Sequence, residues 1–297
     1  PPSHFGELFR MMGKEKNPLI MSTALDHMFK IVRDVKEEQR AALELCVMDL
    51  LGENKTDACH LYILRKMTTC ATSPEVLNQI EWIWRHHNDP LLNEYDYMEM
   101  AYRLAIMHPQ QSKEILSTQR ARLQNEDMRK EFDYVSRACN PDANERTKVF
   151  NSLLRPENRQ QDLWAFHTLQ LLNSDVYEPQ CNSYIEPSLK SLEYLQQTSD
   201  VFFPEKWMKA LMENHKSKEA AMIIDNFMKA NPNYPTNLKN KVLEASWIIM
   251  KQMPYVEPPK PTPAPTPTTA KTQVKKTAKS KTTAKSAPAK KTTQKKK

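Results

Sequence analysis

Apolar residues recur every three to four positions along most of the chain, between about residue 18 and residue 253. This spacing places them on one face of an α-helix, whereas a half-buried strand would alternate apolar and polar residues. Local start signals divide the pattern into separate helices. Ser73, Pro74 and Glu75, for example, supply an N-cap, a proline for the first turn and an acid near the positive end of the helix dipole. The pattern therefore predicts an all-α chain.

About thirteen helices are predicted, and each starts roughly sixteen to twenty residues after the one before. Two successive helices then have about the length of the two-helix unit in HEAT-type repeats. Because no repeated consensus is visible, we expect an irregular HEAT-like helical solenoid or bowl over residues 18–254. Residues 1–17 have weaker periodicity, with Gly6 and Gly13 as predicted breaks, and the chain opens on Pro1 without an initiator methionine. We interpret this segment as a lead-in from a truncated upstream domain.

The composition changes abruptly near the C-terminal end. From Pro258 to Lys297 the chain has twelve lysines, no acidic residue and many prolines, threonines and alanines. Such a segment has almost nothing apolar to bury, so residues 255–297 are predicted to be a disordered basic tail. The formal net charge of +7 includes these lysines, and 7 − 12 leaves −5 for the rest of the chain. The helical part is therefore mildly acidic.

The sequence contains none of the common catalytic motifs. It has no His-Glu-x-x-His, no Gly-x-Ser-x-Gly, no dinucleotide fingerprint and, with only 3 glycines, no phosphate-binding glycine-rich loop. His86 and His87 are adjacent, so we expect cations at the negative end of a helix dipole rather than metal ligands. The five cysteines are expected to be core thiols. No run of about 18 apolar residues is present, so no membrane span is predicted.

Three polar residues, Glu157, Asn158 and Arg159, stand at the start of a helix that is apolar nearly all round. In one interpretation Glu157 or Asn158 caps this helix and Arg159 forms a buried pair. In the other, the three residues face a solvent cavity and contact a substrate. The sequence leaves both open.

An aromatic cluster is expected further along the same region. Its members are Trp164, Phe202, Phe203 and Trp207. Pro204 suits the first position of the next helix, and Phe202 lies two residues before it. Phe202 is therefore predicted to pack on Trp207 as a hydrophobic staple. The cluster is interpreted as core or as an interface to a neighbouring domain.

Taken together, several segments carry a family resemblance. They are Phe150-Asn-Ser-Leu-Leu-Arg-Pro-Glu-Asn-Arg159, Trp164, Leu171-Leu-Asn173, Tyr184-Ile-Glu-Pro-Ser-Leu189, Leu195-Gln-Gln-Thr-Ser-Asp-Val-Phe-Phe-Pro204, Trp207, His215, Ala220-Ala221, Asn231-Pro-Asn-Tyr-Pro235 and Leu238-Lys-Asn-Lys241. In this order they resemble the C-terminal helical domain of the aminopeptidase N type zinc aminopeptidases, peptidase family M-one, of the bacterial type. The chain departs from that pattern at Ser174-Asp175, where relatives tend to have His-Pro.

The resemblance implies that the parent protein is a zinc-dependent aminopeptidase that removes N-terminal residues from peptides. In that family an upstream domain holds the zinc through His-Glu-x-x-His and a more distant glutamate, and the helical domain encloses the substrate chamber above it. The implied partners are therefore the upstream catalytic domain of the same polypeptide and peptide substrates, with zinc in the parent protein and none bound by this chain.

A different class of function stays open. The chain could be a free-standing helical-repeat scaffold whose lysine-rich tail binds nucleic acid or another anionic surface, with weak and sequence-independent affinity. A His-Glu-x-x-His in the few hundred residues before Pro1 would decide for the enzyme. An initiator methionine just before Pro1 would favour the scaffold.

Overall fold

The computed structural model describes residues 5–32, 35–52 and 56–253. Within these ranges it has 14 α-helices and no β-strand, so the predicted all-α class is confirmed. None of these helices is long and apolar enough to cross a membrane. The predicted tail, residues 255–297, lies outside the described residues.

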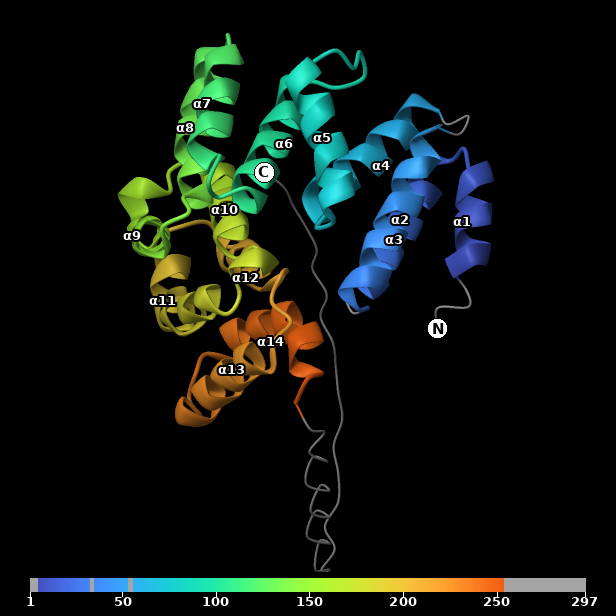
Figure 1. Ribbon diagram of the computed structural model, residues 1–297. Helices are drawn as coiled ribbons and strands as arrows, with labels where there is room; N and C mark the ends of the chain where they lie inside the picture. The colour runs from blue at the N-terminus through green and yellow to red at the C-terminus, as the bar shows by residue number, and fades with distance from the viewer. Residues whose placement is uncertain (1–4, 33–34, 53–55, 254–297) are drawn as a thin grey trace, which may run out of the picture. The chain divides into compact units, whose positions relative to one another are not determined.

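The helices follow one another with short connections (Figure 1). The α-helices are α1 (Phe5–Lys14), α2 (Pro18–Val32), α3 (Glu37–Asp49), α4 (Asp57–Cys70), α5 (Pro74–His86), α6 (Glu94–Met107), α7 (Ser112–Arg122), α8 (Glu126–Val135), α9 (Ala143–Leu153), α10 (Asp162–Leu172), α11 (Ile185–Gln197), α12 (Phe203–Met212), α13 (Lys218–Ala230) and α14 (Thr236–Met250). Short 3-10 helices are η2 (Leu50–Gly52), η3 (Ser136–Cys139), η4 (Pro156–Asn158), η5 (Asp175–Tyr177) and η6 (Gln180–Tyr184).

The segment predicted to be a lead-in forms a helix of its own. α1 runs through both Gly6 and Gly13, so the breaks predicted at these residues are wrong. A glycine within a helix costs about 1 kcal/mol relative to alanine. Burial of Phe5 and Met12 on the same helix offsets this cost, since burying a large apolar side chain contributes roughly 1.5 to 3 kcal/mol.

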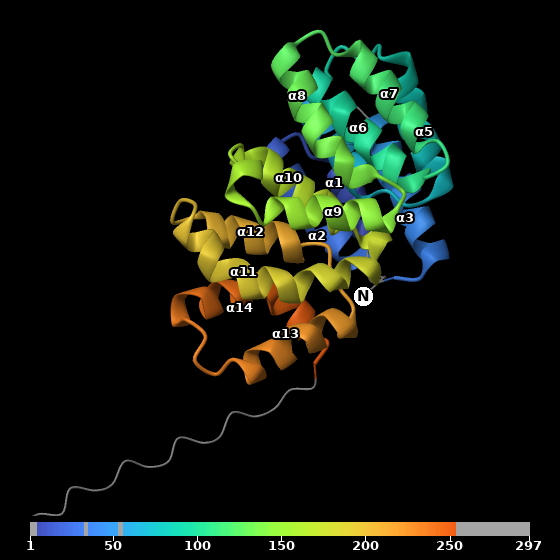
Figure 2. The ribbon, with the colours of Figure 1, turned by 90° about the vertical axis from the view of Figure 1, so that its left-hand side faces the viewer.

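Helices pack against the next helix but one as well as against the next, which is the arrangement of a helical solenoid. One row consists of α2, α4, α6, η3, α10, α12 and α14, each in contact with its neighbours in the row, and we call it the central row. In a second row, α3 contacts α5 and α11 contacts α13. Figure 2 shows the last part of this arrangement, where α14 and α13 lie below α12 and α11.

The buried apolar side chains form two clusters that meet at α10. The first covers residues 5–139 and the second residues 138–249. Leu171 of α10 packs against both clusters, Trp164 packs against the first, and Leu169 belongs to the second. α10 thus joins the two parts of the helical stack, as expected for a helix that is apolar on several sides.

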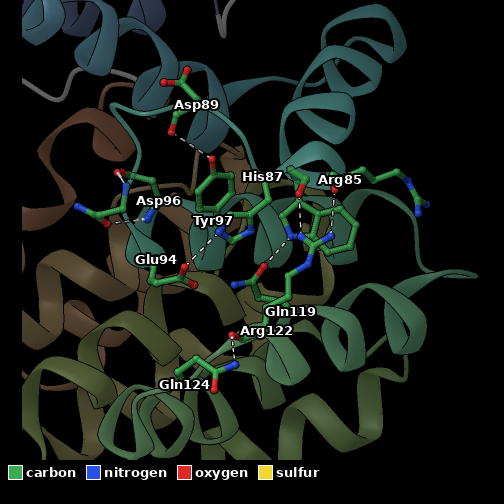
Figure 3. A network of polar contacts seen from close by, with 11 residues as sticks. Arg85, His87, Asp89, Glu94, Asp96, Tyr97, Gln119, Arg122 and Gln124 are labelled. Atoms are coloured by element: carbon green, nitrogen blue, oxygen red, sulfur yellow. Dashed lines mark hydrogen bonds and ion pairs between the residues drawn. The ribbon is translucent and has the colours of Figure 1, made fainter.

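The end of α5 shows how polar side chains close a helix in this fold (Figure 3). His87 has a left-handed backbone, with φ of 50°, and its ring stacks on Tyr97 at 3.7 Å while Nε2 lies 3.1 Å from Glu94. Arg122 donates to two carbonyls at the end of α5, over 2.7 and 3.2 Å. The Nδ1 atom of His86 lies 2.8 Å from a carbonyl of the last turn. Both histidines therefore lie at the helix end, as predicted.

Candidate functional site

A cavity of about 780 Å³ lies along the central row. Its walls come from α2, α4, α6, α10, α12 and α14, together with α3. Helices from both ends of the described chain therefore bound the same space. Its volume lies within the range of about 300 to 1,000 Å³ that is common for ligand-binding sites.

Charged side chains line much of this cavity. The acidic ones are Asp26, Glu44, Glu99, Asp175, Glu205, Glu213 and Glu244, and the basic ones are Arg40, Lys66, Arg103, Lys209 and Lys241. Several pair with one another: Lys66 with Asp26 at 2.6 Å, Lys241 with Glu205 at 3.4 Å and Arg103 with Asp175 at 3.8 Å. These three pairs account for six of the twelve charged side chains just named.

A buried carboxylate forms part of the wall at α3. Glu44 is fully buried and accepts hydrogen bonds from Thr72 N, Thr72 Oγ1 and Ser73 N, over 2.8 to 3.1 Å. Ser73 is the N-cap residue of α5 but makes no side-chain capping bond. Because Glu44 accepts a hydrogen bond from Ser73 N, its carboxylate lies near the positive end of the dipole of that helix. Arg103 of α6 donates twice to the carbonyl of Ala71, at 2.6 and 3.0 Å. The two side chains fix the loop between α4 and α5.

Arg40 lies one turn before Glu44 on α3 and lines the same cavity. Its side chain is half-buried, and its Nε atom is shielded from solvent without a hydrogen-bond partner among the described residues. The neighbouring Glu44 is directed to Thr72 and Ser73 instead. Arg40 is therefore a cation in the cavity wall with no carboxylate paired to it in the described part of the chain.

Where α10 meets α6, His167 pairs with a carboxylate. Its Nε2 atom lies 3.2 Å from Glu99, and its ring stands edge-on to Tyr102 at 5.4 Å. Burial alone would lower the pKa of His167, but Glu99 and Glu131 together raise it above its usual value. The charged form of the imidazole is therefore favoured at this contact between the two helices.

His215 is buried in the cavity wall after α12. Its Nδ1 atom lies 2.9 Å from Oδ1 of Asn182, and its Nε2 atom lies 2.9 Å from Oδ1 of Asn173. Glu178 lies 3.7 Å from the ring and accepts a hydrogen bond from Ser217 N at 3.1 Å. Burial by itself raises the pKa of Glu178, but His215 and Ser217 outweigh burial and lower it to about 2. This network joins the ends of α10 and α12 to the start of α13.

The three polar residues predicted as chamber contacts do not line this cavity. Glu157 is exposed, Asn158 is half-buried and Arg159 is 2% exposed. Arg159 donates to Thr198 Oγ1, to Ser199 Oγ at 3.3 Å and to a main-chain carbonyl at 3.2 Å, so its partners are neutral oxygens rather than a carboxylate. α10 begins only at Asp162, and neither Glu157 nor Asn158 caps it. Their contact with a substrate stays a prediction.

The aromatic residues divide between core and surface. Phe203 and Trp207 are fully buried with ring centroids 5.8 Å apart, and Trp164 is partly buried with its ring 5.9 Å from that of Tyr134. Phe202 is 61% exposed, so the predicted packing of Phe202 on Trp207 is wrong, and Phe203 takes that place. α12 begins at Phe203, and the side chains of adjacent residues point in different directions. Phe202 stays an interface candidate.

The charged side chains that line the cavity could not be predicted as a group from the sequence, because no local pattern brings them together. Lys66 and Asp26 pair across 40 positions of the chain, and only the packing of α2 on α4 brings them together. One signal was present. Arg103 interrupts an otherwise apolar stretch from Ala101 to Ile106, and a charge within an apolar stretch indicates a buried polar contact.

The chain matches no protein-family model and no curated protein. The resemblance to the aminopeptidase N type enzymes therefore rests on the segments given above, and the function assigned on that basis is a proposal.

Proposed function

We propose that the described helices form the C-terminal domain of a zinc aminopeptidase, in which they enclose the peptide substrate beside an active site carried by the upstream part of the same polypeptide. The observation that carries this proposal is the cavity along the central row. Helices α2, α3, α4 and α6 contribute to its walls together with α10, α12 and α14, so both ends of the described chain bound one space. The resemblance of Phe150–Arg159 and Leu195–Pro204 to this class of enzyme supports the same conclusion.

In this proposal the two parts of the protein have different tasks. The upstream domain holds the zinc and activates the attacking water, which is the chemistry that His-Glu-x-x-His performs. The helices described here bind and orient the peptide. No group of three or more His, Cys, Asp or Glu residues within the described ranges could hold a metal ion.

Purified with zinc, the chain is expected not to hydrolyse an aminoacyl anilide, because its sequence contains no His-Glu-x-x-His. The measurement is release of the aniline with and without a chelator. A polypeptide extended upstream through a His-Glu-x-x-His motif is the positive control and should turn over the same substrate. Chelator-sensitive turnover by the chain alone would place the chemistry within it and overturn the proposal.

Filling the cavity of the whole enzyme is expected to slow the cleavage of long peptides more than that of a single-residue anilide. Ala245 lies on α14 and lines the cavity, so Ala245→Trp places an indole in the space assigned to the peptide. We expect kcat/KM for a decapeptide to fall about tenfold, the factor that a loss of about 1.4 kcal/mol produces. The anilide should be affected less than about twofold.

Ala121→Trp is the matched control, because Ala121 is exposed on α7 and does not line the cavity. Thermal melting of both variants establishes that they are folded. If the two substitutions slow decapeptide cleavage equally, the cavity is not the peptide site.

A further inference from the structure

We propose that the cavity binds a carboxylate of its ligand through Arg40. The inference rests on the proposed function, because it takes the cavity as the place that holds the peptide, and it adds the chemical group that is recognised there. It is carried by one observation, a half-buried arginine in the cavity wall whose Nε atom has no partner among the described residues.

A buried N–H group without an acceptor is rare in folded proteins, because it has lost its bond to water and gained nothing in return. The acceptor nearest in sequence does not serve Arg40. Glu44 is one turn away on the same helix, but its oxygens accept four hydrogen bonds from Thr72 and Ser73. An acceptor for Arg40 therefore has to come from outside the described residues.

Other arginines of this protein show which acceptor suits that atom. Arg65 binds Asp96 through Nε at 2.6 Å and Nη2 at 3.0 Å. Arg120 binds Asp133 through the same two atoms, at 2.6 and 2.8 Å. In both pairs the Nε edge of the guanidinium holds the two oxygens of a carboxylate, which is a strong and directional arrangement. The Nε atom of Arg40 has no such partner among the described residues.

The surroundings favour a singly charged anion. Arg103, also in the cavity wall, already has Asp175 at 3.8 Å and the carbonyl of Ala71 as partners. Among the described residues of the wall, Arg40 is therefore the one arginine without a partner. Carboxylates elsewhere in the wall would repel a doubly charged phosphate more strongly than a carboxylate. A peptide offers this group at its C-terminus or in an aspartate or glutamate side chain.

Titration calorimetry with three versions of one nine-residue peptide of Ala, Ser and Leu tests the inference. The first has a free C-terminal carboxylate, the second is amidated, and the third is amidated with Asp in place of the central residue. Each is titrated into the chain, into Arg40→Gln and into Arg155→Gln. Arg155 is the matched control, since it is exposed and lies outside the cavity wall.

We expect at least one carboxylate-bearing peptide to bind the unmodified chain about tenfold more tightly than the amidated peptide, because charge-assisted hydrogen bonds to a carboxylate are stronger than neutral ones. Arg40→Gln should abolish that preference and leave the affinity for the amidated peptide unchanged, while Arg155→Gln should keep it. Tight binding of the free acid alone identifies the C-terminus as the source, and tight binding of the Asp peptide identifies a side chain.

Equal binding of all three peptides to the unmodified chain would overturn the inference and leave the proposed function standing. A preference that survives Arg40→Gln would likewise overturn it, because another group would then be responsible. If none of the peptides binds, the proposed function fails and the inference fails with it.

Discussion

Replacing Glu44 with alanine is expected to lower the free energy of unfolding by about 3 to 4 kcal/mol, the loss typical when a buried charged acceptor is removed from its donors. Glu44 is 0% exposed and is the acceptor for Thr72 N, Thr72 Oγ1 and Ser73 N. Alanine leaves these donors buried beside an empty space. Because they lie immediately before α5, the start of that helix should loosen first. Equilibrium denaturation in urea measures the change.

Two further variants separate this explanation from a general effect of losing a charge on α3. Glu38→Ala removes an exposed glutamate in the first turn of the same helix and should change stability by less than about 0.5 kcal/mol. Glu44→Gln keeps one oxygen acceptor but turns an N–H₂ group toward the donors, and should cost about 2 kcal/mol. A loss no larger for Glu44→Ala than for Glu38→Ala would contradict the role assigned to Glu44.

Features decided by neighbours in the chain could be predicted from the sequence. α5 begins at Pro74, as its start signal predicts, and Ser217 caps α13 through a bond of 3.1 Å to Ala220 N. A prediction was wrong where a shift of one residue in the start of a helix decides which side chain is buried. The sequence does not say which of Phe202 and Phe203 is the first helical residue, and that choice decides which ring is buried against Trp207.

Contacts between distant parts of the chain could not be predicted, because they depend on how whole helices pack. Arg159 illustrates this. Its position before an apolar helix allowed a buried pair or a substrate contact, and the structure places it against Thr198, which is 39 residues away. The cavity depends on the same kind of information, since Arg40 of α3 and Ala245 of α14 line one space although about two hundred residues separate them. Helices were predictable one by one, and the site that they form together was not.

Acid is expected to weaken the fold through Glu178. An ordinary glutamate has a pKa of 4.5, and in the folded chain the pKa of Glu178 is lowered to about 2, since His215 and Ser217 outweigh the opposing effect of burial. A lowered pKa means that the ionised carboxylate stabilises the folded state. This contribution is complete above about pH 4.5 and is lost as the pH falls toward 2. The shift corresponds to about 3 kcal/mol, and solvent screening of a partly exposed group reduces this to roughly 1 to 2 kcal/mol.

The variant Glu178→Gln isolates this contribution, because glutamine can still accept the bond from Ser217 N but has no charge to lose. At pH 7 we expect it to be less stable than the unmodified chain by roughly 1 to 2 kcal/mol, and the difference should shrink as the pH falls from 4.5 to 2. Glu193→Gln, at an exposed position of α11, should show a negligible difference throughout. The contacts of Glu178 join the turn before η6 to the turn before α13. If the difference in the free energy of unfolding between the two proteins stayed constant with pH, neutral hydrogen bonds and not the charge of Glu178 would hold these turns together.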